Sequence, residues 1–168
     1  TPAGALLARL VRELTRGLED VERARAGTLE VRLGAGDSVL QWLVIPRLPR
    51  LGPALTGIGL ELTALGSEDV ERELLAGTRG FGIRRMKEAT SADLTSAPLG
   101  VASYEVFSAR HAGKLHLAIT TGEPALTRPQ EALGTPALRC DTFPRVAQAV
   151  RSGHYRGVMP TFARSMPP

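Results

Sequence analysis

The sequence predicts an α/β fold made of two successive units. Segments in which apolar and polar residues alternate, as they do in half-buried strands, are followed by segments whose apolar residues recur at helical spacing. In the first unit the order is strand, helix, strand, helix, strand, which favours a parallel sheet. Hydrophobic residues make up 43% of the 168-residue chain and charged residues 23%, so the chain can bury a core of ordinary size.

The first expected element is a helix from residue 2 to about residue 25. Pro2 suits a first-turn position, and the helix is expected to end at Gly27. Its apolar residues follow one another at spacings of four, three, four and three, which forms a heptad seam: Leu7, Val11, Leu14, Leu18 and Val21. Such a seam can pack on its own domain or on a second copy of the chain. We favour the dimerising interpretation, because the helix is terminal and ends at Gly27, so that it resembles an appended arm. Gly17 inside the helix costs about 1 kcal/mol relative to alanine, which a partner helix would have to offset.

The first α/β unit is expected between residues 28 and 83. Its strands are "TLEVRLG" (28–34), "GIGLELTAL" (57–65) and "FGI" (81–83), and its helix is "SEDVERELLAG" (67–77). Ser67 is expected to cap this helix, and two acidic residues lie in its positively polarised first turn.

A glycine-flanked polar turn precedes a strongly apolar segment in "GAGDSVLQWLVIP" (34–46). Two interpretations remain open. The turn either changes direction between two core elements, with Asp37 and Ser38 acting as N-cap residues, or it forms the floor of a ligand site at the start of a helix.

The second α/β unit is expected between residues 103 and 160. Its strands lie at 103–107, "KLHLAIT" (114–120), "PALRC" (136–140) and "YRGVMP" (155–160), and its helices are "TRPQEALG" (127–134) and "FPRVAQAVRSG" (143–153). No further element is expected after residue 160.

The composition excludes several classes of site. An aromatic fraction of 4% argues against a stacking platform for single-stranded nucleic acid. A single cysteine, Cys140, excludes an internal disulfide and a cysteine-rich metal site, and we expect it to be a small core residue. His111, His116 and His154 are not at metal-ligand spacing, and His116 is expected on a sheet face. We therefore expect no metal and no cofactor.

Motifs of catalysis and of membrane insertion are missing from the sequence. It contains no P-loop, no complete dinucleotide fingerprint, no nucleophile elbow and no combination of nucleophile, base and orienting group, so we expect no enzyme. No apolar run reaches the ~20 residues that span a membrane, and arginines interrupt the leucines near the N-terminus, which argues against a signal peptide. Because the chain begins at Thr1, we expect it to be a fragment or a processed form. The net charge of +4 is scattered, which favours solvated surface charges over a DNA-binding arm.

Five phrases in order resemble a LysR-type transcriptional regulator that lacks its N-terminal winged helix-turn-helix domain. They are "TPAG" (1–4), "VRLGAGDSVLQWLVIPRLPRL" (31–51), "GIGLELTALGSEDVERELLAGTRGFGI" (57–83), "APLGVASYEVF" (97–107) and "RCDTFPRVAQAVRSGHYRGVMP" (139–160). The chain departs from the family pattern in one extra residue before Pro46, in Gly80 where an acidic residue is common, and in a short stretch between Phe107 and Leu115. The C-terminal helix of the first lobe is also expected to be missing after Pro168.

The resemblance implies a two-lobed, periplasmic-binding-protein-like (type 2) effector domain preceded by a long linker helix. Residues 1–27 would be the linker and dimerisation helix. Residues 28–97 would form the first lobe, with 159–168 returning to it, and residues 98–158 would form the second lobe.

The resemblance also implies a bacterial, cytoplasmic, DNA-binding transcription regulator, of which this chain is the part that senses a small-molecule effector and oligomerises. Its partners would be a second copy in a homodimer or homotetramer, promoter DNA through the absent winged helix-turn-helix domain, and RNA polymerase as a further candidate. No membrane is implied.

The positions that match the family's effector pocket follow the carboxyl ends of expected strands, where open α/β sheets bind ligands. They are Gly36, Asp37, Ser38, Gly66, Ser67, Arg84, Thr120, Thr121, Gly122, Thr142 and Phe143. Backbone N–H groups at a helix start attract an anion, and Gly36 permits close approach of the backbone. Asp37 would repel an anion, so it would cap the helix or select a cationic or neutral effector. Arg84 either pairs with a carboxylate or is a solvated surface charge.

Two other functions fit the same fold class. A solute-binding protein of a transport system would share the two-lobed fold, but the heptad helix and the lack of an export signal argue against it. A small α/β enzyme would need a catalytic constellation, and Ser38 has no base or acid arranged around it in the sequence.

Overall fold

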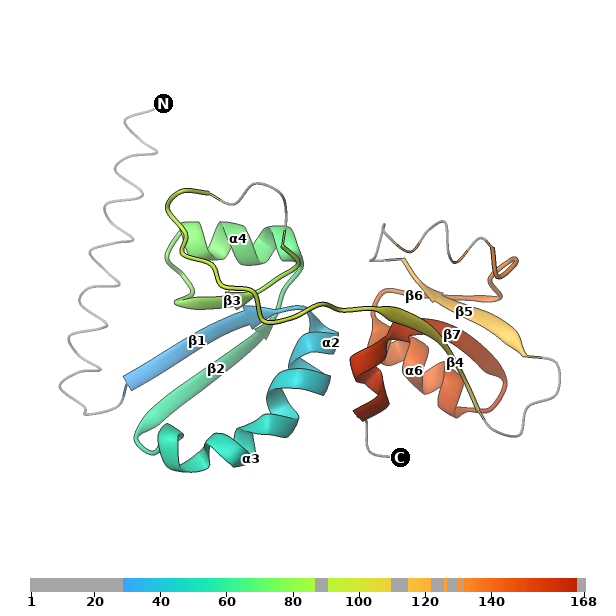
Figure 1. Ribbon diagram of the computed structural model, residues 1–168, viewed down its shortest axis with the longest axis horizontal. Coiled ribbons are helices and arrows are strands. Elements are labelled where there is room, and N and C mark those ends of the chain that lie inside the picture. Colours follow the sequence, from blue (N-terminus) through green and yellow to red (C-terminus); the bar gives the residue numbers. More distant parts are fainter. Residues whose placement is uncertain are drawn as a thin grey trace.

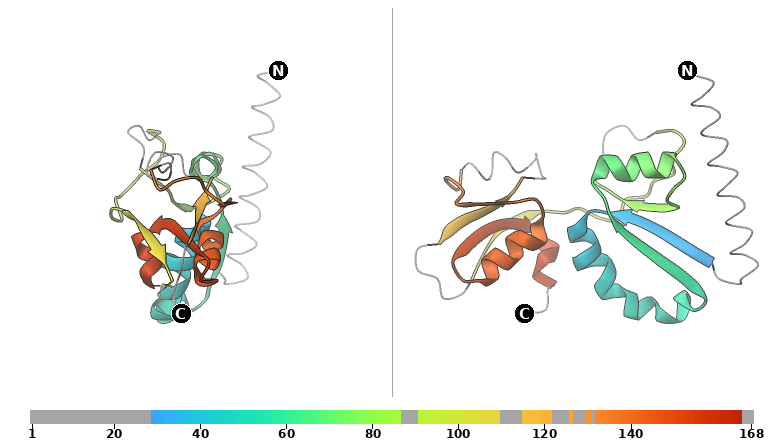
Figure 2. Two further views of the ribbon diagram at one scale, coloured as in Figure 1. Left: turned by 90° about the vertical axis from the view of Figure 1, so that its right-hand side faces the viewer. Right: turned by 180° about the vertical axis from the view of Figure 1, so that it is seen from behind.

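The protein consists of two lobes, each built on a β-sheet (Figure 1). The structure, a computed structural model, describes residues 29–86, 91–109, 115–121, 126, 130 and 132–165. An extended segment without regular secondary structure crosses from the first lobe to the second, as the front and back views show (Figures 1 and 2). The expected helix over residues 2–25, with its heptad seam, lies outside the described residues.

The sheet of the first lobe has three parallel strands, as expected. The central strand β1 (Leu29–Ala35) lies between β2 (Ile58–Ala64) and β3 (Phe81–Ile83). β1 and β2 are paired along their full lengths, from Leu29 opposite Ile58 to Ala35 opposite Ala64. β2 and β3 lie within the segments where strands are expected, and β1 extends one residue beyond its expected end, to Ala35.

The helix α4 (Ser67–Leu75) packs closely on one face of this sheet because Gly82 leaves room for it. A Cβ atom added to Gly82 would lie 2.5 Å from Cγ1 of Val70 and 2.9 Å from Cδ1 of Leu74, both of which belong to α4. Val70, a residue of α4, is buried where the helix meets the sheet. The helix has Gly66 at its N-cap and makes no side-chain cap hydrogen bond. The prediction that Ser67 caps it is therefore wrong, and Ser67 is instead the first helical residue.

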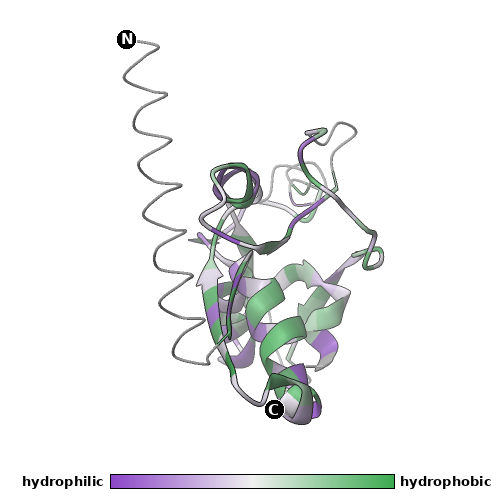
Figure 3. Cartoon of the chain, turned by 90° about the vertical axis from the view of Figure 1, so that its left-hand side faces the viewer, coloured by the Kyte–Doolittle hydropathy of each residue, from purple (hydrophilic) through white to green (hydrophobic). Residues whose placement is uncertain are grey.

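The opposite face of the sheet is covered by a run of short helices between β1 and β2 (Figure 1). The run consists of α2 (Asp37–Val39), the π-helix η1 (Leu40–Val44), η2 (Ile45–Arg47), α3 (Leu48–Leu51) and η3 (Gly52–Leu55). A proline is the second residue of each of η2, α3 and η3, and these prolines explain the breaks, because proline lacks the N–H group that would continue the preceding turns. Apolar residues make up much of this run, as the hydropathy colouring shows (Figure 3).

The sheet of the second lobe is mixed, in the order β4-β7-β5-β6. β4 (Tyr104–Ser108) is antiparallel to β7 (Tyr155–Pro160), whereas β5 (His116–Thr120) is parallel to β7 and to β6 (Leu138–Cys140). The helix α6 (Phe143–Arg151) packs on this sheet at Gly157, where an added Cβ atom would lie 2.5 Å from Cγ1 of Val146.

The elements of the second lobe agree with the sequence prediction except at its end. β7 continues to Pro160, which pairs with Tyr104, so this sheet extends beyond the expected lobe boundary at residue 158. A short helix, η5 (Thr161–Ser165), follows where no element is expected. Most of the expected helix "TRPQEALG" lies outside the described residues. The division of the whole chain into domains remains a prediction.

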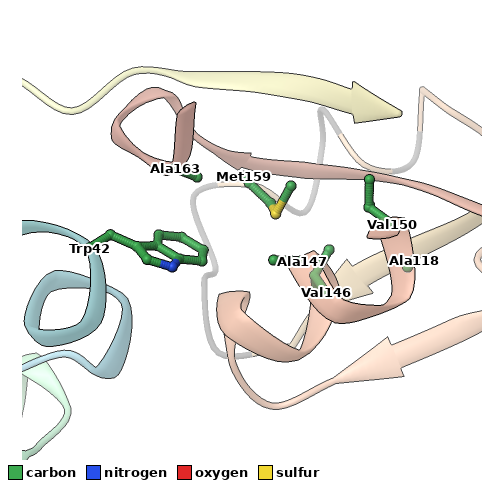
Figure 4. Packing of buried hydrophobic residues seen from close by; sticks show 7 residues of the cluster. All are labelled: Trp42, Ala118, Val146, Ala147, Val150, Met159 and Ala163. Atoms are coloured by element: carbon green, nitrogen blue, oxygen red, sulfur yellow. The ribbon is translucent and has the colours of Figure 1, made fainter. Parts of the chain in front are cut away.

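A hydrophobic core in the second lobe also takes in one side chain from the first lobe. Its buried members, shown in Figure 4, are Trp42, Ala118, Val146, Ala147, Val150, Met159 and Ala163. Trp42 extends from η1 of the first lobe and is only 4% exposed. Its ring meets that of Phe162 in η5 edge-on, with centroids 6.1 Å apart. The junction of the two lobes is therefore a packed apolar contact, and the candidate site lies beside it.

No helix in the described part of the chain is long and apolar enough to cross a lipid bilayer.

Candidate functional site

A pocket of about 250 Å³ lies between the helical run of the first lobe and α6 of the second. The first lobe lines it with three residues from α2 and η1, and the second lobe lines it with residues at the start of α6 and along its length. The lining residues are Asp37, Gln41, Trp42, Thr142, Pro144, Arg145, Ala147, Gln148 and Arg151. Because both lobes contribute walls, any molecule bound here touches both.

The wall from the first lobe begins directly after β1. Gly36 is the N-cap of α2, and its carbonyl oxygen accepts hydrogen bonds from the N–H groups of Val39 and Leu40 at 2.9 and 3.0 Å. Asp37 and Gln41 are four residues apart, so they share one side of the helical run. The π-helix that follows is a rare conformation, which is often found at functional sites.

The wall from the second lobe is one stripe of α6. Thr142, the N-cap residue, is followed at intervals of three by Arg145, Gln148 and Arg151, so successive members are neighbours and form a row that winds slowly around the helix, and all four line the pocket. Val146 and Val150, on another face, are buried in the core. The helix is amphipathic, and it presents its polar stripe to the pocket and its apolar stripe to the sheet.

The two walls carry opposite charges. On the second lobe, Nη1 of Arg145 donates to both carboxylate oxygens of Asp141, each at 2.7 Å. Arg145 and Asp141 are 66% and 61% exposed, and such an exposed pair contributes roughly 0–1 kcal/mol to stability. On the first lobe, the side chain of Asp37 is exposed and makes no hydrogen bond or ion pair within the described residues.

Two of the residues predicted for the site, Asp37 and Thr142, line the pocket. Neither caps a helix through its side chain, because both α2 and α6 lack a side-chain cap hydrogen bond. Gly36 adjoins the pocket as the N-cap of α2. Ser38 is half-buried on α2 and is not among the lining residues, and Phe143 packs instead against the core and the Tyr104 ring, with centroids 5.8 Å apart.

The predicted residues that follow β2 and β3 lie away from this pocket. Gly66 and Ser67 form the start of α4. Arg84 is not a solvated surface charge: its side chain is only 10% exposed, and Nη1 lies 3.6 Å from Oε2 of Glu71 on α4. The carboxylate with which Arg84 pairs is therefore one of the protein's own.

The predicted residues at the end of β5 and directly after it form hydrogen bonds within the second lobe. Thr120 is buried, and its hydroxyl donates to the carbonyl oxygen of Asp141 at 3.5 Å. The N–H group and the hydroxyl of Thr121 both donate to the carbonyl oxygen of Cys140, at 2.8 and 3.2 Å. Gly122 lies outside the described residues, and so do the predicted dimerisation residues Leu7, Val11, Leu14, Leu18 and Val21.

The sequence reasoning missed seven of the residues that line the pocket: Gln41, Trp42, Pro144, Arg145, Ala147, Gln148 and Arg151. A signal for part of this set was present. Gln41 is four residues after Asp37, and Arg145 is three residues after Thr142. On a helix, residues at these spacings are neighbours, so both could have been predicted to lie beside the predicted site residues.

The remaining nucleophilic and titratable candidates occupy structural positions. Cys140 packs against the core cluster, and burial is the main cause that raises the pKa of its thiol. His116 lies exposed on β5, with its ring centroid 6.1 Å from that of Tyr155. Among the described residues, no group of His, Cys, Asp and Glu side chains is arranged to hold a metal ion.

Comparison with known proteins gives matches in structure and none in sequence. No protein-family model and no curated protein matches the chain. HinK, a LysR family transcriptional regulator from Pseudomonas aeruginosa, superposes with a TM-score of 0.59 at 18% identity, over 96% of this chain and 63% of HinK. The chain thus spans less than two thirds of the length of HinK.

For two regulatory domains, the match covers a larger share of the known protein than it does for HinK. The reduced OxyR regulatory domain from P. aeruginosa gives a TM-score of 0.66 at 17% identity, over 84% of this chain and 78% of that domain. The regulatory domain of MexT, a transcriptional activator in P. aeruginosa, gives 0.60 at 17% identity, over 80% of this chain and 74% of that domain. These neighbours are regulatory proteins rather than enzymes. The chain has the two-lobed, periplasmic-binding-protein-like (type 2) fold of the regulatory domains of LysR-type transcriptional regulators.

Proposed function

We propose that this chain is the effector-sensing and oligomerising part of a bacterial LysR-type transcriptional regulator, and that its effector is a small molecule bound between α2–η1 and α6. The observation that carries the proposal is the position of the pocket. Its walls come from both lobes of a fold that the chain shares with regulatory domains, and the lobes meet at a packed contact beside it.

The proposed mechanism is a population shift. The two lobes are taken to adopt two relative arrangements, and a molecule that touches both walls stabilises the one in which the walls are correctly spaced for it. The shift in the equilibrium is limited by the difference between the ligand's affinities for the two arrangements. The pocket supplies polar groups for binding from both sides. In the proposed mechanism the chain acts by binding its effector.

The rest of the proposal concerns the whole protein. Residues 2–25 would form the helix through which two or four copies associate. A winged helix-turn-helix domain outside this sequence would bind promoter DNA, RNA polymerase would be a further partner, and the protein would act in the cytoplasm.

The test is a thermal-shift screen of organic acids, amino acids and aromatic acids, repeated with a variant whose pocket is filled. A ligand at a concentration of 100 times its Kd stabilises the folded state by about 2.7 kcal/mol, which raises the Tm of a chain of this size by on the order of 5–10 °C. Gln148→Phe places a larger side chain in the pocket from an exposed helix position and should abolish the shift. Arg72→Phe, on the exposed side of α4, is the matched control and should retain it. A shift that persists in Gln148→Phe would place the ligand elsewhere and would overturn the proposal.

A further inference from the structure

We infer that the pocket between the lobes takes a small zwitterion, a molecule that carries one ammonium and one carboxylate group, such as an aliphatic α-amino acid. The inference rests on the proposed function and names the ligand class of that same site. It derives from the charges on the two walls, the hydrogen-bonding capacity that remains on each, and the size of the cavity.

The wall from the first lobe is suited to an ammonium group. Asp37 presents a carboxylate with no partner within the described residues, and an ionised carboxylate accepts hydrogen bonds but donates none. Gln41 lies beside it, one helical turn further along, and its amide oxygen is a second acceptor. An amino group bound here would be held by a charge-assisted hydrogen bond, which is about twice as strong as a neutral one.

The wall from the second lobe is suited to a carboxylate. Arg145 has five N–H donors in a planar fork, and its bond to Asp141 uses Nη1 alone. Nη2 and Nε remain for a second carboxylate, which the fork can bind in bidentate geometry. Arg151 adds a second positive charge to the same wall, and Thr142 and Gln148 add neutral donors.

The charges of the two walls balance. The lining has one acidic side chain, Asp37, and two basic ones, Arg145 and Arg151, and Arg145 is paired with the carboxylate of Asp141, which lies outside the lining. A dianion would bring negative charge towards Asp37, and a simple amine would bring positive charge towards the two arginines. A zwitterion meets an opposite charge on each wall, and because it touches both lobes it also links them.

The size of the cavity limits the rest of the ligand. A volume of about 250 Å³ corresponds to the share of roughly eight water molecules in liquid water, which indicates a ligand of about eight to ten non-hydrogen atoms. The apolar part of the lining comes from Trp42, Pro144 and Ala147. An aliphatic side chain of the size found in valine or leucine fits this description.

The test uses the fluorescence of Trp42, because it is the only tryptophan in the chain and it lines the pocket. The 168-residue chain is titrated with glycine and with the proteinogenic L-amino acids other than tryptophan and tyrosine, whose own fluorescence would mask that of Trp42. For each amino acid that changes the emission, the titration is repeated with the carboxylic acid that lacks its amino group and with the amine that lacks its carboxylate. For leucine these are 4-methylpentanoate and 3-methylbutylamine. We expect at least one amino acid to bind, and both of its analogues to bind at least tenfold more weakly.

Variants of Asp37 and Arg145 test which wall binds the ammonium group of the ligand and which wall binds its carboxylate. Asp37→Asn and Arg145→Gln should each weaken amino-acid binding at least tenfold. Asp93→Asn and Arg50→Gln make the same chemical changes at exposed positions outside the pocket and should have no effect. Asp141→Asn should preserve or strengthen binding, because it removes the negative charge that competes with the ligand for Arg145, and this result would separate a direct role of the arginine from a structural one.

Two results would overturn the inference, and they differ in what they leave standing. If the deaminated acid binds as tightly as the amino acid and Asp37→Asn has no effect, the ligand is an anion, and the proposed effector site still stands. If no amino acid, organic acid or aromatic acid changes either the emission or the Tm, both the inference and the proposed function fail.

Discussion

Replacing Trp42 by alanine should weaken the junction of the two lobes more than any single change on the surface. The side chain is 4% exposed although it belongs to the first lobe, and it packs among Ala147, Met159 and Ala163 of the second. A tryptophan buries roughly 200 Å², which at about 25 cal/mol/Å² gives an upper estimate of about 5 kcal/mol. Truncations of buried aromatic residues cost about 3–5 kcal/mol, and we expect this range.

The assay is urea unfolding followed by far-ultraviolet circular dichroism, because the variant has no tryptophan to report fluorescence. A loss of 3–5 kcal/mol corresponds to a fall in Tm on the order of 6–20 °C for a chain of this size. Trp42→Phe keeps one aromatic ring in the junction and should cost only about 1–2 kcal/mol.

Hydrogen exchange tests whether the loss arises at the junction. Trp42→Ala should lower the protection of amide groups in both η1 and α6, which lie on opposite sides of the contact. Val70→Ala removes buried volume between α4 and the sheet of the first lobe. It should lower the protection of amide groups in the first lobe and leave the protection of α6 unchanged. A cost below about 1 kcal/mol for Trp42→Ala, or unchanged protection of α6, would refute the argument that this side chain joins the lobes.

Three further predictions concern other parts of the chain. Leu14→Glu combined with Leu18→Glu places charges in the heptad seam and should shift sedimentation velocity profiles towards the monomer; an unchanged profile would contradict the proposed dimerising helix. Gly82→Ala should cost about 1–3 kcal/mol in urea unfolding, because the added methyl group would lie 2.5 Å from an α4 methyl group, whereas Gly80→Ala, with open space around it, should cost less than about 0.5 kcal/mol. The pKa of the Glu61 carboxyl lies below its usual value of 4.5, chiefly through its hydrogen bond with a neighbouring arginine. The stabilisation it provides is therefore complete above that value and is lost as the pH falls below it. Glu61→Gln should lower the unfolding free energy at pH 7 by less than about 1 kcal/mol, since the group is 42% exposed, and should reduce the acid dependence of urea unfolding below pH 4.5; an identical pH profile would disprove the assignment.

The strands were predictable because their sequences carry the two-residue period of a β-strand. In β1 and β2 the apolar residues alternate with polar ones, and the structure pairs the two strands in register along their full lengths. The short helices between them were less predictable in detail. Pro46, Pro49 and Pro53 indicate where the helical run is interrupted, but nothing in "LQWLV" indicates a π-helix rather than an α-helix.

The site was predictable only where local rules apply. Asp37 and Thr142 follow strands at their carboxyl ends, and both line the pocket. Arg84 obeys the same rule and yet pairs with Glu71, because the partner of a charge depends on which helix packs beside it. Gln41 and Arg145 could not be brought together from the sequence, since they lie on different lobes and meet only through the packing of η1 against the second lobe.

Trp42 has two roles in the structure, and their magnitudes bear on how a ligand could act. The side chain lines the pocket and also fills the core at the junction, so a ligand that contacts it acts on the group that holds the lobes together. The coupling between a ligand and a conformational change is typically 1–3 kcal/mol, which is less than the 3–5 kcal/mol that we assign to the burial of Trp42. Ligand binding should therefore shift the angle or spacing of the lobes around Trp42 without pulling the side chain out of the second lobe. A regulator that works in this way keeps its core intact in both states, and it transmits the difference through the relative position of α2–η1 and α6.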